Sequence, residues 1–349
     1  MKIIPTPKPD SYDVAVVIGR WQMPHKGHDT LFLKALALAP RVVVVVGSAF
    51  RARDTRNPFN AQERQAMILA SLAPEVRERV TFIPMRDYFD DARWACEVER
   101  SVQAVAGPGA RIALVGFKKD ATSGYLDRFP YWRGVAVAPA VNLDATSLRN
   151  VYFSGAQWDR IVDVLRPLVS DGVLRYLELW AHLPAYSERV GEHLEVVEYR
   201  KEWTAPWYVT ADALVRVADH ILLVRRGGRI GYDLWALPGG FVNPFEEFLP
   251  GALRELQEET NLGFSAAKLT AALRDSAVLG HPLRSARGRL VSHAFYFAFG
   301  EGTLPEVRPS SDAKETRWVH ISDLPKYEEL MFEDHYMGIS RLVPDLPAS

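Results

Sequence analysis

Short apolar runs alternate with amphipathic stretches over roughly the first 150 residues. "VAVVI" at 14–18 and "RVVVVVGSA" at 41–49 are continuous runs that end in small residues, which is typical of buried parallel strands. Weaker runs of the same kind follow at 80–85, 111–116 and 134–139. The stretches at 26–39 and 60–72 carry apolar residues at helical spacing. This alternation predicts an α/β domain, with a parallel sheet covered by helices on both faces.

The pattern changes after the predicted sheet. Two amphipathic stretches, at 158–170 and 173–183, predict helices that close the first domain. We interpret the polar residues 186–203 as a linker between a first domain of residues 1–185 and a second of residues 204–349. In the second domain one strong helical segment interrupts runs that predict strands, at 207–217, 220–226, 293–299 and 315–321. Strands with few helices indicate a mixed α+β sandwich.

Composition narrows the class of protein. A chain of 349 residues exceeds the usual size of one hydrophobic core, which supports two domains. Its 42 basic and 43 acidic side chains give a net charge of −1, so we expect neither nucleic acid nor an anionic membrane as a partner. The single cysteine, Cys96, fits a reducing compartment. Prolines interrupt the N-terminal segment where a signal peptide needs an apolar core, and no apolar run is long enough to span a bilayer. We therefore expect a cytoplasmic protein.

Two histidines flank a glycine directly after the first predicted strand, in "PHKGH" at 24–28. The N-terminus of the helix that follows presents unpaired N–H groups and a positive dipole, which bind anions. Gly27 lets the backbone approach a ligand closely, the rings of His25 and His28 add two donors, and Arg20 lies on the approach. An arbitrary pair of histidines at this spacing more often caps a helix or faces solvent. In this context it predicts a site for the phosphates of a nucleotide.

Longer stretches around these residues resemble known signatures. "GRWQMPHKGH" at 19–28 resembles the G-R-F-x-P-x-H-x-G-H signature of the nucleotidyltransferase superfamily, and "DATSLRN" at 144–150 resembles its S-S-T-x-x-R signature. Residues 57–68 and 116–132 resemble segments of the archaeal-type nicotinamide-nucleotide adenylyltransferases, which make NAD from nicotinamide mononucleotide and ATP. The resemblance covers roughly residues 11–180 and implies a Rossmann-like domain.

This resemblance implies roles in adenylyl transfer. His25 and His28 would be catalytic residues that hold the ATP phosphates and the charge developing on them, and Arg149 would neutralise the leaving pyrophosphate together with Mg²⁺. Contacts to ATP and nicotinamide mononucleotide are implied for Gly19, Arg20, Gly27, Lys119, Asp120, Trp132, Thr146 and Arg149. For Trp132 two interpretations stay open, stacking on the nicotinamide ring or a place in the core.

A cluster of carboxylates lies on the strong helix predicted in the second domain. Glu255, Glu258 and Glu259 share one helix face because they are spaced i, i+3 and i+4. Like charges at this spacing repel, and a divalent cation removes the repulsion; carboxylate oxygens suit Mg²⁺ or Mn²⁺. Arg254 can pair with Glu246 and orient the helix. The alternative is a solvated acidic helix face.

The spacing G-x5-E-x7-R-E-x-x-E-E from Gly240 to Glu259 matches the Nudix box, and the one departure is Asn261, where the family has glycine. Asparagine tolerates left-handed geometry, so we expect the helix cap to survive. The resemblance covers about 205–325 and implies an α/β/α sandwich that hydrolyses a nucleoside diphosphate linked to another group. Glu258 and Glu259 would be catalytic, and the implied metal ligands are Gly240, Glu255, Glu258 and Glu259.

Residues outside the box decide the base and the substrate. A loop carboxylate often acts as base in this family, and Asp312 and Glu315 are the candidates. Trp203, Trp207 and Trp235 are candidates for stacking on an adenine, although tryptophans that border a core need no such role.

Both signatures on one chain resemble bifunctional enzymes of NAD metabolism. One half would make NAD; the other would split ADP-ribose into AMP and ribose 5-phosphate. The expected partners are thus the small molecules ATP, nicotinamide mononucleotide and ADP-ribose. Three alternatives stay open: another phosphate acceptor for the first domain, another nucleoside diphosphate derivative for the second, or a second domain that only senses ADP-ribose or NAD. The sequence leaves open a homo-oligomer and a preference for nicotinamide or nicotinate mononucleotide.

Overall fold

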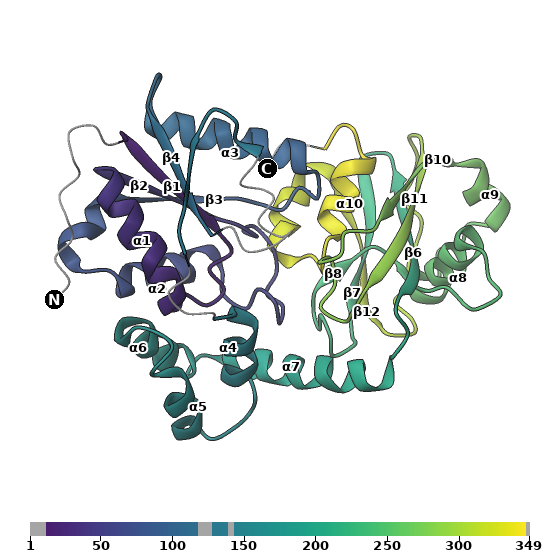
Figure 1. Ribbon diagram of the computed structural model, residues 1–349. Coiled ribbons are helices and arrows are strands. Elements are labelled where there is room, and N and C mark those ends of the chain that lie inside the picture. The colour runs from purple at the N-terminus through teal and green to yellow at the C-terminus, as the bar shows by residue number, and fades with distance from the viewer. Residues whose placement is uncertain (1–11, 118–127, 139–142, 347–349) are drawn as a thin grey trace. The chain divides into compact units, whose positions relative to one another are not determined.

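The structure is a computed structural model that describes residues 12–117, 128–138 and 143–346 (Figure 1). The chain separates into two compact units, Met1–Phe50 with Arg56–Gly191 and Arg51–Thr55 with Glu192–Ser349. The boundary at Gly191 falls inside the segment interpreted as a linker. That segment belongs to helix α7 (Pro184–Glu202), which the sequence analysis did not predict.

A parallel sheet forms the centre of the first unit. Its strands are β1 (Val14–Gly19), β2 (Arg41–Val46), β3 (Val80–Pro84), β4 (Ile112–Gly116) and β5 (Arg133–Ala136), as the apolar runs predicted. Their spatial order is β3-β2-β1-β4-β5, and every neighbouring pair is parallel. The chain order reverses between β1 and β4, and in open parallel sheets ligands bind beyond the carboxyl ends of the strands at such a point.

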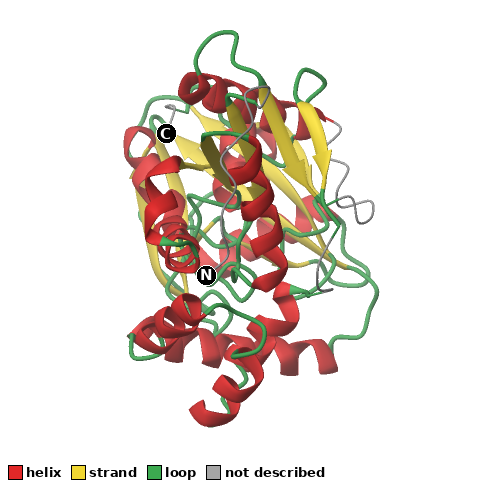
Figure 2. Ribbon diagram, turned by 60° about the vertical axis from the view of Figure 1, so that its left-hand side comes forward, coloured by secondary structure: helices red, strands yellow, loops and turns green. Residues whose placement is uncertain are grey.

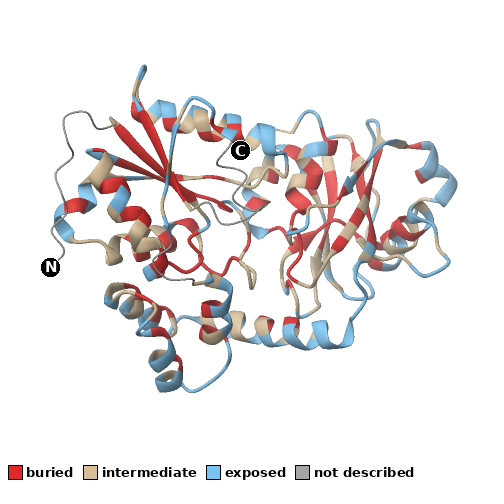
Figure 3. Ribbon diagram, in the orientation of Figure 1, coloured by how far each residue is buried: buried red, intermediate tan, exposed pale blue. Residues whose placement is uncertain are grey.

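Helices cover both faces of this sheet. Alternate side chains of β1 and β2 pack on α1 (Lys26–Leu38) and α2 (Ala61–Ser71), and the others pack on α3 (Asp91–Ala106). Strands β1, β2 and β4 are buried along most of their length, whereas the edge strand β5 is not (Figure 3). This confirms the predicted α/β layers. Helix α3 was not predicted, although its buried residues Ala95, Val98, Val102 and Ala106 recur at helical spacing.

Three short helices and an aromatic cluster complete the first unit. The helices are α4 (Ala145–Tyr152), α5 (Trp158–Leu165) and α6 (Asp171–Trp180), and the last two confirm the predicted closing helices. Tyr152, Phe153 and Trp180 are buried together with Phe59, which precedes α2. This packing fixes the end of α4 beside the loop that leads into α2. Between α2 and β3 the chain forms a 3₁₀ turn at Pro74–Arg79.

The second unit is built on a mixed sheet. The main strand order is β10-β11-β6-β7-β12. Two short strands pair outside this order, β8 with β7 and β9 with β6. Strands β6 and β11 are parallel and the other pairs are antiparallel. The bounds are β6 (Tyr208–Val217), β7 (His220–Arg226), β8 (Trp235–Ala236), β9 (Gly239–Phe241), β10 (Leu273–Leu279), β11 (Leu290–Phe299) and β12 (Ala313–His320).

Helices flank both faces of this sheet as well (Figure 2). Helix α8 (Phe248–Thr260) and the short α9 (Ala266–Ala271) cover one face, and α10 (His335–Leu342) with a 3₁₀ segment (Ile321–Leu330) covers the other. The result is the predicted α/β/α sandwich, although α9, α10 and β10 were not predicted. Within the described residues, we find no helix that is long and apolar enough to cross a membrane.

Two candidate active sites

The two histidines of the first site cap helix α1. His25 is the N-cap, and its Nδ1 accepts the backbone N–H of Gly27 at 3.1 Å. The Nδ1 of His28 accepts the backbone N–H of His25 at 3.3 Å, and the two rings stack with centroids 3.8 Å apart. A ring nitrogen that accepts a hydrogen bond carries no proton, so each neutral ring carries its proton on Nε2. The capping pattern thereby sets two Nε2–H donors at one helix N-terminus.

Buried polar side chains hold the loop that carries these histidines. Gln22 is 3% exposed, and its amide pairs with both backbone groups of Phe59, at 2.8 and 3.1 Å. Arg64 of α2 is 1% exposed and donates to the carbonyls of Arg20 at 2.6 Å and Gly47 at 2.5 Å. One guanidinium thus joins the carboxyl ends of β1 and β2. Sequence reasoning missed this role, although Arg64 lies inside the stretch whose family resemblance was noted.

Helix α4 brings the second signature to the same loop. Arg149 is 4% exposed; its Nη1 donates to the carbonyl of Gln22, and its Nη2 donates to Thr146 Oγ1 at 3.2 Å. The backbone N–H of Lys26 donates to Leu168 O at 2.9 Å, which ties the start of α1 to the segment after α5. The structure therefore places Thr146 and Arg149 against the loop that leads to His25 and His28.

The remaining predicted contacts of the first site differ in their surroundings. Gly19 ends β1 under the indole of Trp21, where a Cβ would lie 3.0 Å from two ring atoms. Arg20 follows it and is exposed. Trp132 stacks on buried Phe129 with ring centroids 4.5 Å apart, a contact that accounts for the tryptophan without a ligand. Lys119 and Asp120 lie outside the described residues.

Arg254 organises the carboxylates of the second site. Its guanidinium donates to both carboxylate oxygens of Glu246, at 2.8 and 2.9 Å, as predicted, and these bonds lower the pKa of Glu246 to about 2. Its Nη1 also donates to Glu255 at 2.7 Å and to Glu258 at 3.0 Å. Asn261 adopts φ 49° at the end of α8, so the left-handed cap does survive without glycine.

Glu259 is the most buried carboxylate of the helix. It is 6% exposed and accepts the backbone N–H of Gly239 at 3.0 Å. Burial raises its pKa to about 8 despite that bond, and the nearby charges of Asp312 and Glu255 act in the same direction. The absence of a side chain at Gly240 lets the Glu255 carboxylate lie close to the backbone, because a Cβ at this position would lie 2.5 Å from the carboxyl carbon of Glu255.

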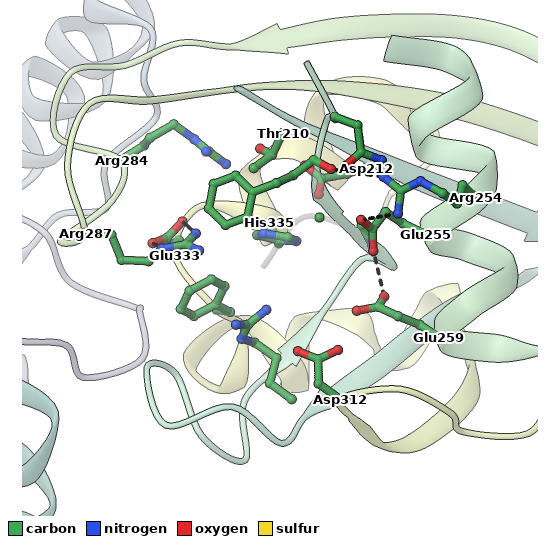
Figure 4. Close-up of a pocket in the computed structure, with 16 residues that line it drawn as sticks. Thr210, Asp212, Arg254, Glu255, Glu259, Arg284, Arg287, Asp312, Glu333 and His335 are labelled. Carbon is green, nitrogen blue, oxygen red and sulfur yellow. Dashed lines mark hydrogen bonds and ion pairs between the residues drawn. The ribbon is translucent and has the colours of Figure 1, made fainter. Parts of the chain in front are cut away.

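These residues line a cavity of about 320 Å³ (Figure 4). Gly240, Glu255 and Glu259 line it, whereas Glu258 does not and its side chain is 50% exposed. Of the two candidate bases, Asp312 lines the cavity. Glu315 does not line it; it pairs with Arg225 at 3.4 Å and also with Arg317.

The three candidate tryptophans lie in different surroundings. Trp203 stacks on Phe241, a wall residue of the cavity, with centroids 5.1 Å apart. Trp207 is 64% exposed, and Trp235 is buried in the core beside α10. Trp203 is therefore the one of the three in contact with the cavity wall.

A divalent cation suits the carboxylate end of the cavity. Glu255 and Glu259 are hard oxygen donors, and burial raises the pKa of both, which a bound cation would reverse. In the part of the chain that the structure describes, no group of three or more His, Cys, Asp or Glu side chains is arranged as a metal site. Glu258 accepts from Arg254, so its role as a third carboxylate ligand stays a prediction.

Sequence reasoning missed the opposite wall of the cavity. Arg284, Arg287 and Glu333 lie there, away from α8, and His335 and Asp212 lie between the two ends (Figure 4). These residues belong to no motif, and they come from β6, from the loop between β10 and β11, and from the start of α10. Only the fold brings them together.

Comparison with known proteins agrees with the division of the chain into two units. Residues 206–339 match the NUDIX domain family and residues 16–89 match the cytidylyltransferase-like family. A nicotinamide/nicotinic acid mononucleotide adenylyltransferase from Acinetobacter baylyi is 32% identical over 178 residues, or 51% of this chain and 91% of the relative. An ADP-ribose pyrophosphatase from Methanocaldococcus jannaschii is 30% identical over 141 residues, or 40% of this chain and 77% of the relative.

One type of solved structure matches both units together. The crystal structure of a bifunctional NMN adenylyltransferase/ADP ribose pyrophosphatase from Francisella tularensis, complexed with AMP and a manganese ion, is 34% identical with a TM-score of 0.87. The match covers 96% of this chain and 100% of that chain. The chain belongs to this bifunctional family. As a member of the bifunctional family, it is an enzyme with a nucleotidyltransferase domain and a Nudix hydrolase domain, as the two signatures predicted.

Proposed function

We propose that the first domain, predicted at residues 1–185, transfers the adenylyl group of ATP to nicotinamide mononucleotide, giving NAD and pyrophosphate. The stacked pair of His25 and His28 beside Arg149 carries this proposal. A 5′-phosphate oxygen of the mononucleotide attacks the α-phosphorus, and the bond from that phosphorus to the bridging oxygen breaks. Pyrophosphate leaves with the electron pair. No covalent enzyme intermediate is needed, so the domain acts by alignment and by stabilising charge.

Each group has a part in that step. The Nε2–H donors of His25 and His28 stabilise charge on the phosphate oxygens, at a helix N-terminus that favours anions. Arg149, held by Gln22 and Thr146, supports the leaving pyrophosphate. Arg64 and Gln22 keep the loop in place and touch no substrate in this scheme.

The test of the first activity is His28→Ala, which removes one donor. NAD formation from ATP and nicotinamide mononucleotide should fall about 100-fold or more, because one oxyanion donor contributes on that order. ADP-ribose hydrolysis by the same protein should be unchanged and serves as the internal control. NAD formation at the normal rate in this variant would refute the assigned role. Faster adenylylation of another phosphate acceptor would show that nicotinamide mononucleotide is not the preferred substrate.

We infer that the second domain, predicted at residues 204–349, hydrolyses ADP-ribose to AMP and ribose 5-phosphate with Mg²⁺. The support is Glu255 and Glu259 in one cavity, both with raised pKa. Glu255, Glu259 and the Gly240 carbonyl, with Glu258 as the fourth predicted ligand, would hold the cation. When bound, the cation neutralises the pyrophosphate and acidifies water. Arg254 orients the helix carboxylates, and Asp312 is positioned to take a proton from water.

The matching test uses Glu258→Gln, together with chromatography of the products. The wild-type protein should release AMP from ADP-ribose in preference to NADH and diadenosine polyphosphates. The variant should lose hydrolysis and keep NAD formation. Tight ADP-ribose binding with no metal-dependent turnover in the wild type would replace the hydrolase with a sensor. Loss of both activities in a folded variant would contradict two independent sites.

A further inference from the structure

The end of the Nudix cavity that faces α8 has assigned roles, whereas the opposite end has none. This inference concerns that opposite end and rests on the proposed hydrolase activity. Figure 4 shows Arg284 on the side of the cavity opposite Glu255 and Glu259, with Glu333 beside Arg287 on the same side.

Arg284 has one donor left over. It is 2% exposed, and its Nε and Nη2 donate to Asp334 at 3.0 and 2.7 Å. Its Nη1 is buried and has no hydrogen-bond partner among the described residues. A buried donor left without a partner is costly, and such groups in native proteins commonly mark a missing ligand or water. The open position lies on the cavity wall, where a ligand can reach it.

An acceptor and a second donor lie on the same wall. The Glu333 side chain is 6% exposed and is held by Arg287 at 3.2 Å and by the Ser285 hydroxyl. His335 accepts the backbone N–H of Leu237 on Nδ1 at 3.0 Å, so its ring proton lies on Nε2 and can be donated. The wall therefore offers both donors and an acceptor.

The charge at this end disfavours a phosphate. Burial lowers the pKa of His335, which keeps the ring neutral. The two guanidinium groups of this wall are already paired with carboxylates, Arg284 with Asp334 at 2.7 Å and Arg287 with Glu333 at 3.2 Å. An added anion would find both cations neutralised, whereas a hydroxyl group can accept from an arginine and donate to a carboxylate without adding charge.

We propose that Arg284, Glu333 and His335 form a subsite for the vicinal hydroxyls of a pentose attached to the diphosphate. The 2-hydroxyl accepts from Arg284 Nη1 and donates to Glu333, and the neighbouring 3-hydroxyl accepts from His335 Nε2. The subsite selects nucleoside diphosphate sugars over nucleoside diphosphates that lack the second sugar. ADP-ribose contains two riboses, and the experiment separates them.

The first arm varies the substrate and leaves the protein intact. Hydrolysis by the wild type is compared for ADP-ribose, for the analogue without the 2′-hydroxyl of the adenosine ribose, and for the analogue without the 2-hydroxyl of the terminal ribose. One analogue should lose about tenfold to a hundredfold in kcat/KM, mainly through KM, and it identifies the pentose that is bound. Equal rates for all three compounds would overturn the proposal.

The second arm changes Arg284 to Lys, which keeps the charge beside Asp334 and removes the Nη1 donor. Arg216→Lys is the matched control, because Arg216 also pairs with an aspartate through two bonds, at 2.7 and 2.9 Å, and does not line the cavity. Arg284→Lys should raise the KM for ADP-ribose about tenfold or more and should no longer discriminate against the sensitive deoxy analogue. The proposal is wrong if Arg284→Lys lowers kcat/KM by the same factor for ADP-ribose and for every analogue. It is also wrong if inorganic phosphate competes with ADP-ribose at this end of the cavity.

Calorimetric binding of ADP-ribose in EDTA gives a readout that does not depend on turnover. Arg284→Lys should weaken this binding and Arg216→Lys should not. A wild-type protein that binds ADP-ribose through Arg284 without hydrolysing it would refute the proposed hydrolase and keep the subsite. Normal hydrolysis that Arg284→Lys leaves unchanged would keep the proposed hydrolase and refute the subsite.

Discussion

Cation binding to the Nudix site should displace a proton from Glu259. This carboxyl is 6% exposed, and burial raises its pKa to about 8. With that pKa, about nine-tenths of the molecules carry the proton at pH 7 and about one-tenth at pH 9. Metal ligands must be deprotonated. Binding of Mg²⁺ without nucleotide should therefore release close to one proton at pH 7, and the apparent affinity should rise toward tenfold per pH unit below pH 8 and level off above it.

The same pKa fixes the sign of a stability effect. The folded state keeps the Glu259 proton up to about pH 8, whereas the unfolded chain loses it near the ordinary glutamate pKa of 4.5. The folded state thus binds more protons between these values, so stability of the metal-free domain falls as pH rises through that window, by at most about 1.4 kcal/mol per unit from this group. Glu259→Gln should remove this decline and should be more stable than the wild type at pH 8 in EDTA.

Isothermal titration in buffers of different ionisation enthalpy counts the released protons. The measurement is made at pH 7 and at pH 9 on the wild type and on Glu259→Gln, which should release almost none. Saturable Mg²⁺ binding at pH 7 with fewer than about 0.2 protons released would refute the reasoning, because it would mean that Glu259 is already ionised in the folded protein.

Three further substitutions test the geometry. Gly240→Ala places a Cβ 2.5 Å from the Glu255 carboxyl carbon, so hydrolysis should fall about 100-fold or more while NAD formation is retained; unchanged hydrolysis would contradict the close approach. Arg64→Met removes buried bonds to three carbonyl groups of the β1 and β2 ends, at Arg20, Gly47 and Ser48. It should destabilise the first unit by roughly 3 kcal/mol or more in denaturant unfolding, and a loss within experimental error would refute that role. Trp132→Phe keeps a ring against Phe129, so the KM for nicotinamide mononucleotide should stay within about twofold; a tenfold rise would favour stacking on the nicotinamide ring.

Local patterns predicted most of the framework and the groups with fixed spacing. The β1, β2 and β4 runs are buried on both faces and therefore continuously apolar, and the His25 loop and the α8 carboxylates lie within single turns of chain. The role of Arg64 was not predicted because its bonds reach carbonyls that are distant in sequence.

The far wall of the Nudix cavity was beyond sequence reasoning for the same reason. Arg284 and Asp334 are 50 residues apart and meet only when α10 packs on the sheet. Of the two candidate bases, which one lines the cavity also depends on how β12 and the loop before it are turned, and this could not be read from the sequence.

The parallel pairing of β6 with β11 constrains the order of events during synthesis. Tyr208 pairs with Leu290, so the two strands are joined across more than 80 residues of chain that include α8 and α9. Pairings of such long sequence separation form late and slowly. Helix α8 leaves the ribosome before the strand that completes its sheet. The cavity is complete later still, because Glu333 and His335 follow all the strands of this unit.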